Sequence, residues 1–371
     1  MTGVQLEIQA IAAVTAAACA LPGAFLVLRR LSLLSDAIGH SILLGIVLAF
    51  LVVQELTSPF LVVGAALVGL LTVVAVELVR GTGLVREDAA IGLVFPALFS
   101  LGVVLVARYT DSVHLDTDAV LLGELAFTPF DRLIVGGWDL GPRALWVMSV
   151  ILAVNLVALL LFYKELKLTT FDPALALALG LAPGLVHYGL MTLVSVTAVG
   201  AFTAVGAILV VALMIVPPAT AYLLTDRLGV LLGASVGIGV ASAIGGYWLA
   251  HALDASIAGS MAATAGALFA LAFFFAPGRG VVAAARRRAR QRWEFPQTML
   301  AIHLLNHEGL PEAAVENRID HLDAHLGWEP AFAHEVVERA ERRGLVLSDG
   351  AALELTDRGR AGARSALART A

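Results

Sequence analysis

Long apolar runs recur through most of this 371-residue chain, and they constrain its fold more than any other feature. The runs are residues 6–28, 37–53, 59–79, 89–107, 144–163, 185–199, 202–224, 228–250 and 257–277. A helix needs about 20 apolar residues to cross a bilayer. The chain is 59% hydrophobic and 14% charged, whereas soluble domains are roughly 45–50% apolar and about 25% charged. These features exclude a soluble globular enzyme and predict an all-α polytopic membrane protein.

The number of spans depends on the sixth and seventh runs, which are joined with only Gly200 between them, so that eight or nine spans are possible. Lys and Arg in short loops mark the cytoplasmic side of a membrane. The relevant residues are Arg29, Arg30, Arg80, Arg86, Lys164, Lys167, Arg227 and Arg279. All of them lie on one side only if the two runs cross separately. We therefore expect nine spans, with the N-terminus outside and the C-terminus in the cytoplasm.

Charge divides the chain near Gly278. Residues 1–278 hold 10 Lys and Arg against 16 Asp and Glu, a net charge of −6, and residues 279–371 hold 14 against 13, a net charge of +1. The second part begins with an arginine run and has the composition of a soluble domain. We therefore predict a transmembrane domain over 1–278, a basic linker over 279–294 and a soluble domain over 295–371.

Asp36 and His40 are the clearest candidates for chemistry in the membrane part. They are four residues apart, so on a helix both side chains lie on one face. A carboxylate and an imidazole form half of a site for a divalent metal such as zinc or manganese, and two copies would supply four ligands. Ionisable groups inside a span are usually functional. The structural alternative is that Asp36, after Ser35, caps the helix and that His40 is a packing residue.

Two further stretches break the apolar pattern. In residues 163–180, Asp172-Pro173 predicts a helix start, and Gly180 with Pro183 closes a short amphipathic helix that could dock a partner or merely connect two spans. Pro217-Pro218 lies inside an apolar run and predicts a break in the helix that faces the bundle interior.

No G-x-x-x-x-G-K-[ST] sequence occurs, and neither of the two lysines follows a glycine loop. We therefore expect this chain not to be an enzyme, with any ATP hydrolysis in a separate subunit. No permanently bound cofactor is expected either.

Residues 4 to 278 resemble the permease subunits of bacterial ABC importers for zinc, manganese and iron. The resemblance rests on four motifs in the family's order: Leu31–Ser41, Asp88–Gly92, Phe171–Ala174 with Gly180, and Val216–Ala221. One departure is Ser35, where many relatives have Gly. The resemblance implies a type II importer-like permease in the bacterial inner membrane.

The same resemblance implies partners and site residues. The partners are two ATP-binding cassette ATPase subunits, a second permease copy or paralogue, an extracytoplasmic metal-binding lipoprotein and the membrane lipid. The transported manganese, zinc or iron dication would bind Asp36 and His40. The ATPase would dock on the family's coupling helix, which falls on residues 164–180 and includes Lys164, Glu165, Phe171 and Asp172.

The soluble part has the pattern of a small α+β domain. Helices are expected at 299–305, 312–325 and 330–343, followed by a β-hairpin around Asp349-Gly350 and a last helix from Thr356. Three helices and a hairpin predict a winged helix. The sequences Arg343–Val346 and Leu355–Gly359 resemble the N-terminal domain of metal-dependent repressors.

This tail is open to several functions. DNA binding needs a basic face, and a net charge of +1, mostly in the linker, argues against a nucleic-acid partner. His321 and His325 are spaced for one helix face and form a candidate metal pair, as do His303 and His307, although solvated helix faces are the favoured interpretation of both pairs. Two alternatives to an ATP-driven permease stay open: a secondary metal transporter driven by an ion gradient, and a membrane-bound metal sensor that acts through the tail.

Overall fold

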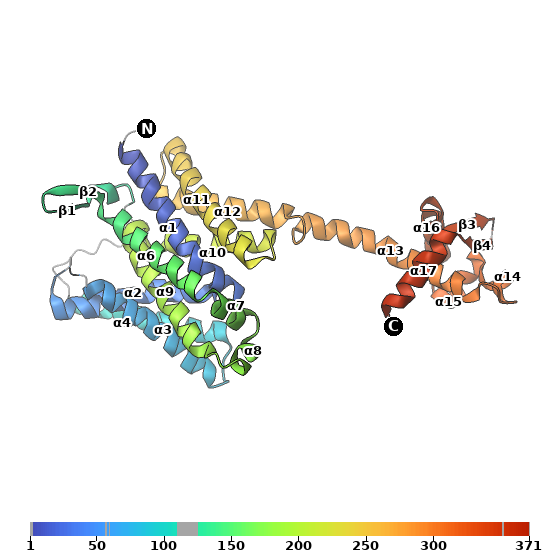
Figure 1. Ribbon diagram of the computed structural model, residues 1–371, viewed down its shortest axis with the longest axis horizontal. Helices are drawn as coiled ribbons and strands as arrows, with labels where there is room; N and C mark the ends of the chain where they lie inside the picture. Colours follow the sequence, from blue (N-terminus) through green and yellow to red (C-terminus); the bar gives the residue numbers. More distant parts are fainter. Residues whose placement is uncertain (1–2, 56–57, 59, 110–124, 351, 371) are drawn as a thin grey trace. The chain divides into compact units, whose positions relative to one another are not determined.

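The computed structural model describes all residues except 1–2, 56–57, 59, 110–124, 351 and 371. The chain forms two compact units, Met1–Gly280 and Val281–Ala371. Figure 1 shows the first as a bundle of long helices and the second as one long helix followed by shorter helices and a β-hairpin.

Among the described residues of the first unit, nine helices are long and apolar enough to cross a membrane. They are α1 (Gly3–Leu28), α2 (Ser32–Val53), α3 (Phe60–Gly81), α4 (Glu87–Tyr109), α6 (Arg143–Leu161), α9 (Pro183–Val205), α10 (Ala207–Leu224), α11 (Leu228–Leu253) and α12 (Ile257–Phe275). Helix α1 packs against α6, α9, α10 and α11, and Phe25 and Leu26 near its end are fully buried. The core of the unit therefore surrounds α1.

The boundary between the sixth and seventh spans differs from the expected position at Gly200. Helix α9 continues through Gly200 and ends at Val205, and α10 starts at Ala207. Gly206 between them has φ +81°, a conformation that glycine adopts without strain. Gly200 instead allows close packing, because a Cβ there would lie 2.3 Å from Cδ1 of Ile151 in α6.

The expected break at Pro217-Pro218 is wrong, because α10 runs through both prolines, which are buried. A proline at position i leaves the carbonyl of residue i−4 without its helical donor, and for Pro218 this is the carbonyl of Met214. Gly23 of α1 lies directly against this oxygen: a Cβ at Gly23 would be 1.9 Å from it. The close contact between α1 and α10 thus covers the freed carbonyl, and the helix continues.

Five short elements are described in the segments between α4, α6 and α9. A turn, η1 (Thr128–Phe130), precedes an antiparallel hairpin of β1 (Arg132–Val135) and β2 (Trp138–Pro142), in which Ile134 faces Asp139. Helices α7 (Tyr163–Phe171) and α8 (Pro173–Ala178) follow α6. Arg132 pairs with Asp139 at 2.5 Å and with Glu7 of α1 at 3.4 Å, so the hairpin is attached to the start of the bundle.

The second unit contains α13 (Val281–His307), α14 (Ala313–Glu316), η2 (Ile319–His321), α15 (Leu322–Leu326), α16 (Pro330–Arg342), β3 (Val346–Asp349), β4 (Ala352–Leu355) and α17 (Asp357–Thr370). Its core consists of apolar side chains from α13, α15, α16 and the hairpin, including Leu300, Leu322, Val336, Val346 and Leu353. In the hairpin Val346 pairs with Leu355 and Asp349 with Ala352. Helix α13 is longer than expected and includes residues 281–294, which the sequence had suggested as a linker.

The helix expected over 312–325 is wrong, because three short pieces replace it. The backbone of Arg318 is extended, with φ −102° and ψ 144°, and forms a bridge to Ala352 of β4. The carbonyl of Asn317 accepts a hydrogen bond from Leu353 N at 2.8 Å. These backbone bonds to the hairpin edge replace the helical bonds at 317–318.

Candidate functional site

Asp36 and His40 lie on one face of α2, as their spacing predicted. Helix α2 starts at Ser32 and has no side-chain cap, so Asp36 is inside the helix and is not its N-cap. His40 Nε2 lies 3.4 Å from Asp36 Oδ1, and the side chains are 35% and 43% exposed, respectively. The pair is therefore inside a predicted membrane span but accessible from one side.

The accessible side of the pair is a cavity of about 220 Å³. It is lined by Asp36, Gly39 and His40 of α2 and by Ala207, Ile208 and Val211 of α10. The first turn of α10 directly follows the bend at Gly206, so the bend places three apolar side chains opposite the polar pair. Two titratable groups thus face a small cavity that is otherwise apolar.

Two aromatic rings of α4 contact the His40 ring. The His40 ring stacks on Phe95, with centroids 5.7 Å apart, and meets the edge of Phe99 at 5.9 Å. These contacts restrict the imidazole to few orientations. Sequence reasoning missed both phenylalanines because nothing in an apolar span distinguishes them from lipid-facing residues.

A polar cluster at the end of α1 was also missed. Arg29 donates to Thr169 Oγ1 at 3.0 Å and Thr170 Oγ1 at 3.1 Å, both in α7, and lies 3.4 Å from His187 Nδ1. Burial lowers the pKa of the Arg29 guanidinium. The arginine therefore joins the end of α1 to α7 and α9.

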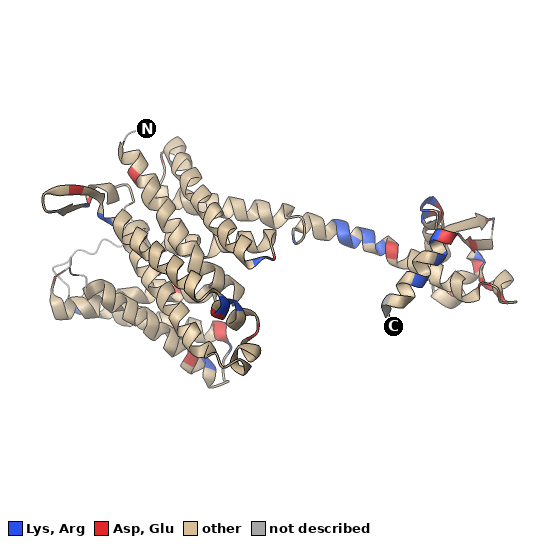
Figure 2. Ribbon diagram, in the orientation of Figure 1, with Lys and Arg blue, Asp and Glu red and all other residues tan. Residues whose placement is uncertain are grey.

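The cluster continues to α3 through Glu77. His187 Nε2 lies 2.8 Å from Glu77 Oε1, and the Tyr188 hydroxyl donates to the other carboxylate oxygen. The sequence did contain one signal for this cluster. Glu77 lies within an apolar run, and an ionisable group inside a span is expected to have a partner. Figure 2 shows charged residues sparse along the first unit and gathered beside α7 and α8.

The candidate docking segment, residues 164–180, forms two helices rather than one. Asp172 separates α7 from α8, and its Oδ1 accepts from Leu175 N at 2.9 Å, which is the N-cap that Asp172-Pro173 predicted. Lys164 is exposed, and Phe171 is 59% exposed. Glu165 is half-buried, and its Oε2 has no hydrogen-bond partner among the described residues. Leu177 and Leu179 are also exposed, at 67% and 64%, so α8 and its end form an apolar surface.

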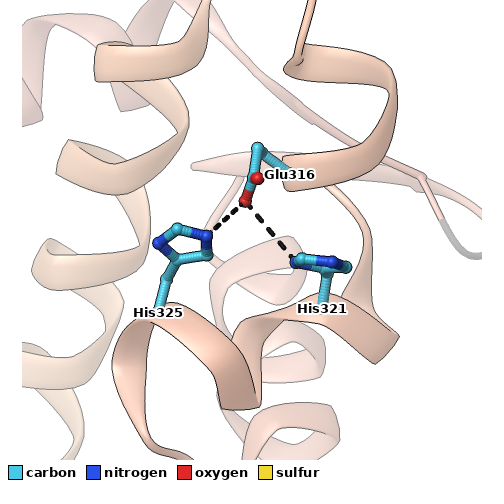
Figure 3. A group of neighbouring side chains, drawn as sticks. All are labelled: Glu316, His321 and His325. Atoms are coloured by element: carbon cyan, nitrogen blue, oxygen red, sulfur yellow. Dashed lines mark ion pairs between the residues drawn. The ribbon is translucent and has the colours of Figure 1, made fainter.

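His321 and His325 lie close together in the second unit, although they do not share one continuous helix. His321 ends η2 and His325 lies in α15, with ring centroids 5.9 Å apart. Between them is the carboxylate of Glu316, whose Oε2 is 2.7 Å from His325 Nε2 and 3.5 Å from His321 Nδ1 (Figure 3). The sequence did not single out Glu316, because the bend at 317–318 brings it there.

The nine apolar helices in the described part of the chain, one of which carries an ionisable pair next to a cavity, are typical of an integral membrane protein of the transporter class. The chain belongs to the ABC 3 transport family, which matches residues 5–276. It is therefore a membrane permease of the ABC transporter class.

Two curated relatives differ in how much of the chain they match. The zinc transport system membrane protein TroD of Treponema pallidum is 49% identical over 354 residues, which cover 95% of this chain and 96% of TroD. The manganese transport system membrane protein MntD of Bacillus subtilis is 49% identical over 264 residues, 71% of this chain and 89% of MntD. The match to TroD therefore extends through most of the second unit.

A solved structure shows the same fold in the membrane unit. This is PsaBC from Streptococcus pneumoniae in complex with Fab, with a TM-score of 0.63 and 27% sequence identity, and the match covers 75% of this chain and 94% of that chain.

Proposed function

We propose that this chain is the permease subunit of an importer that moves a divalent transition metal, manganese, zinc or iron, into the cytoplasm. The observation that carries the proposal is the Asp36–His40 pair, with Nε2 and Oδ1 3.4 Å apart and facing a cavity inside the membrane unit. The names of the zinc and manganese relatives support the substrate class.

Asp36 and a neutral His40 would bind the metal as substrate. One carboxylate and one imidazole suit borderline dications, but two ligands are fewer than the four that zinc prefers. We infer that a second permease copy or a paralogue brings another pair to the open side of the cavity. The Phe95 and Phe99 rings would keep the imidazole directed at the metal, and the apolar side chains of α10 would offer the ion no further ligand.

Transport would be driven from α7 and α8. The exposed Phe171 and the apolar end of α8 form the proposed docking surface for a separate ATPase subunit, with Lys164 beside it. A movement of α7 would be transmitted to α1 and α9 through Arg29. This residue donates hydrogen bonds to Thr169 and Thr170 of α7 and lies next to His187 of α9. Glu165 would stabilise this connection rather than contact the ATPase, because it is half-buried.

The second unit would lie in the cytoplasm as a winged-helix domain. Helices α13, α15 and α16 followed by the β3–β4 hairpin support this interpretation, and the arginine run of α13, visible in Figure 2, fits the cytoplasmic side of the last span. A metal-binding lipoprotein outside the membrane would deliver the substrate.

Metal uptake by the reconstituted complex tests the proposal. Asp36→Asn and His40→Gln keep the size of each side chain but remove the charge or the ligand nitrogen, and uptake with ATP should fall to background while the subunits still assemble. The controls are Asp131→Asn and His251→Gln, which change the same residue types away from the cavity. Full uptake by both α2 variants would overturn the proposed site. Uptake by the chain alone, driven by an ion gradient without ATP, would instead establish a secondary transporter.

The docking surface has its own test. Phe171→Ala should weaken the stimulation of the ATPase by the permease, whereas Leu253→Ala, which changes a residue 65% exposed at the end of α11, should not. Equal stimulation in both variants would leave α7 and α8 as a connector between spans.

A further inference from the structure

The second unit contains a cluster of donor atoms that the transport pathway does not use. Glu316 ends α14, His321 ends η2 and His325 lies in α15, and their ligand atoms are all within 4.8 Å of one another. The bend at 317–318 brings the glutamate to the two histidines, as Figure 3 shows. Three segments of the chain therefore converge on one point.

The carboxylate of Glu316 forms ion pairs with both histidines when their rings are protonated. Its side chain is 17% exposed, and Oε2 lies 2.7 Å from His325 Nε2 and 3.5 Å from His321 Nδ1. In the described part of the chain, neither Glu316 Oε2 nor His321 Nδ1 has a hydrogen-bond partner, and both atoms are buried. With neutral imidazoles these contacts are no longer ion pairs, and buried polar atoms without hydrogen-bond partners are costly. A cation between them would remove that cost.

The spacing fits a tetrahedral transition metal. With metal–ligand distances of 2.0–2.1 Å, the ligands of a tetrahedral zinc site are about 3.3 Å apart. The carboxylate oxygen is 2.7 Å from one imidazole nitrogen and 3.5 Å from the other, so small side-chain movements suffice. Two imidazoles and a carboxylate also match the ligand preference of zinc.

Two further histidines, His303 and His307, lie next to the three donors. His307 Nδ1 donates to the carbonyl of His303 at 2.9 Å, which leaves Nε2 unprotonated in the neutral ring, the arrangement seen in metal-binding histidines. The His307 ring is 6.0 Å from that of His325. His303 Nε2 lies 3.2 Å from the carbonyl of Glu316 and supports the backbone that carries the carboxylate.

We propose that Glu316, His321 and His325 bind a divalent transition metal, zinc in the first instance, with His303 as a positioning residue. The site is separate from Asp36 and His40 and does not depend on the proposed transport. Bound metal would join α14, η2 and α15 and stabilise this corner of the unit, because a ligand that binds only the folded state favours it.

The experiment uses the full chain, purified in detergent, in an Asp36→Ala, His40→Ala background that removes the membrane pair. Zinc is added, and hydrogen–deuterium exchange is followed in peptides covering residues 303–326. Zinc should slow exchange there, and cobalt should give the visible absorption of a tetrahedral site. Glu316→Gln and His325→Ala should each weaken zinc binding by more than roughly 100-fold, since loss of a residue that only hydrogen-bonds to a metal ligand already costs about 10–100-fold.

His334→Ala is the matched control, because His334 is an exposed histidine of α16 in the same unit, and zinc should protect this variant as well as its parent. His303→Ala should cost about 10–100-fold, the range of a positioning residue. Exchange of the hairpin β3–β4 without metal shows whether each variant is folded, and Glu316→Gln keeps the shape of the side chain it replaces. Zinc protection that is absent in the parent, or retained in both Glu316→Gln and His325→Ala, would overturn the proposal.

Discussion

The two units of this chain obtain their stability in different ways. In the membrane unit, helices approach closely at small residues, as where Gly23 of α1 meets the carbonyl of Met214 in α10. Lipid tails are as apolar as the side chains, so packing rather than water exclusion holds such helices together. In the second unit, Leu300, Val336 and Leu353 form a core removed from water, and this burial supplies the driving force. The same type of substitution should therefore have different effects in the two units.

The largest effect is expected from Leu300→Ala in the core of the second unit. Leu300 is fully buried, and truncating a buried leucine costs about 2–5 kcal/mol. Hydrogen–deuterium exchange on the full chain should show faster exchange across residues 281–371 and unchanged exchange in the membrane helices. Leu347→Ala, at a residue 61% exposed in β3, should change stability by less than about 0.5 kcal/mol. Similar exchange in both variants would contradict a water-excluded core.

In the membrane unit, a substitution that adds atoms to a close helix contact should lower stability. Gly23→Ala places a Cβ against Met214 O, which must move away, and overpacking of this kind costs about 1–3 kcal/mol. Thermal stability in detergent should fall, whereas Gly237→Ala should leave it unchanged, because nothing lies within 4 Å of a Cβ there. Equal melting temperatures for both variants would mean that α1 and α10 are not packed through Gly23.

The sequence predicted the membrane helices well because lipid leaves few alternatives to a long apolar helix. It also predicted the relation between Asp36 and His40, which is local to one helix. The position of the bend did not follow, since Gly200 and Gly206 look alike in sequence. Their roles differ only in the folded chain, where Gly206 has φ +81° and Gly200 packs against Ile151. The cavity opposite Asp36 depends on that bend and could not be predicted.

The tail shows a different limit. Its hairpin and α16 followed from local patterns, namely Asp349-Gly350 and an amphipathic helix after Pro330. Helical spacing predicted that His321 and His325 lie close together. In the structure both contact Glu316, which comes near them because the expected helix is interrupted after α14. Backbone bonds from Asn317 and Arg318 to β4 cause the break. They are contacts between distant parts of the chain that no local pattern contains.

A smaller effect is expected from a polar contact between membrane helices. Asn155 of α6 is 2% exposed and donates to Ala18 O of α1 at 3.0 Å and to Thr197 Oγ1 of α9 at 2.8 Å. Asn155→Ala should lower stability by about 0.6–2 kcal/mol, the range of such interhelical bonds. The control is Ser242→Ala, since within the described part of the chain this buried hydroxyl donates to carbonyls of its own helix alone, those of Ile238 and Gly239. If Ser242→Ala lowered stability more than Asn155→Ala, the hydrogen bonds between helices would contribute little to the stability of the membrane unit.

The smallest effect is expected from the surface charges of the second unit. Arg290 and Glu294 form an ion pair at 2.6 Å on α13, and the arginine side chain is 74% exposed. Such pairs are screened by water and salt and are worth about 0.3–0.5 kcal/mol. The arginine also precedes the glutamate, which is the weaker order on a helix.

Arg290→Ala should therefore change the stability of the second unit by no more than about 0.5 kcal/mol, and the difference should shrink as salt is raised from 0.05 to about 0.5 M because the Debye length shortens. Alanine's helix propensity opposes part of the loss. Arg288→Ala, at an exposed position of the same helix, is the control for removing one positive charge. Exchange rates in residues 281–307 at both salt concentrations provide the measurement. A loss comparable to that of Leu300→Ala would mean that ion pairs rather than the apolar core stabilise this unit, and the contrast with the membrane unit would no longer be one of packing against burial.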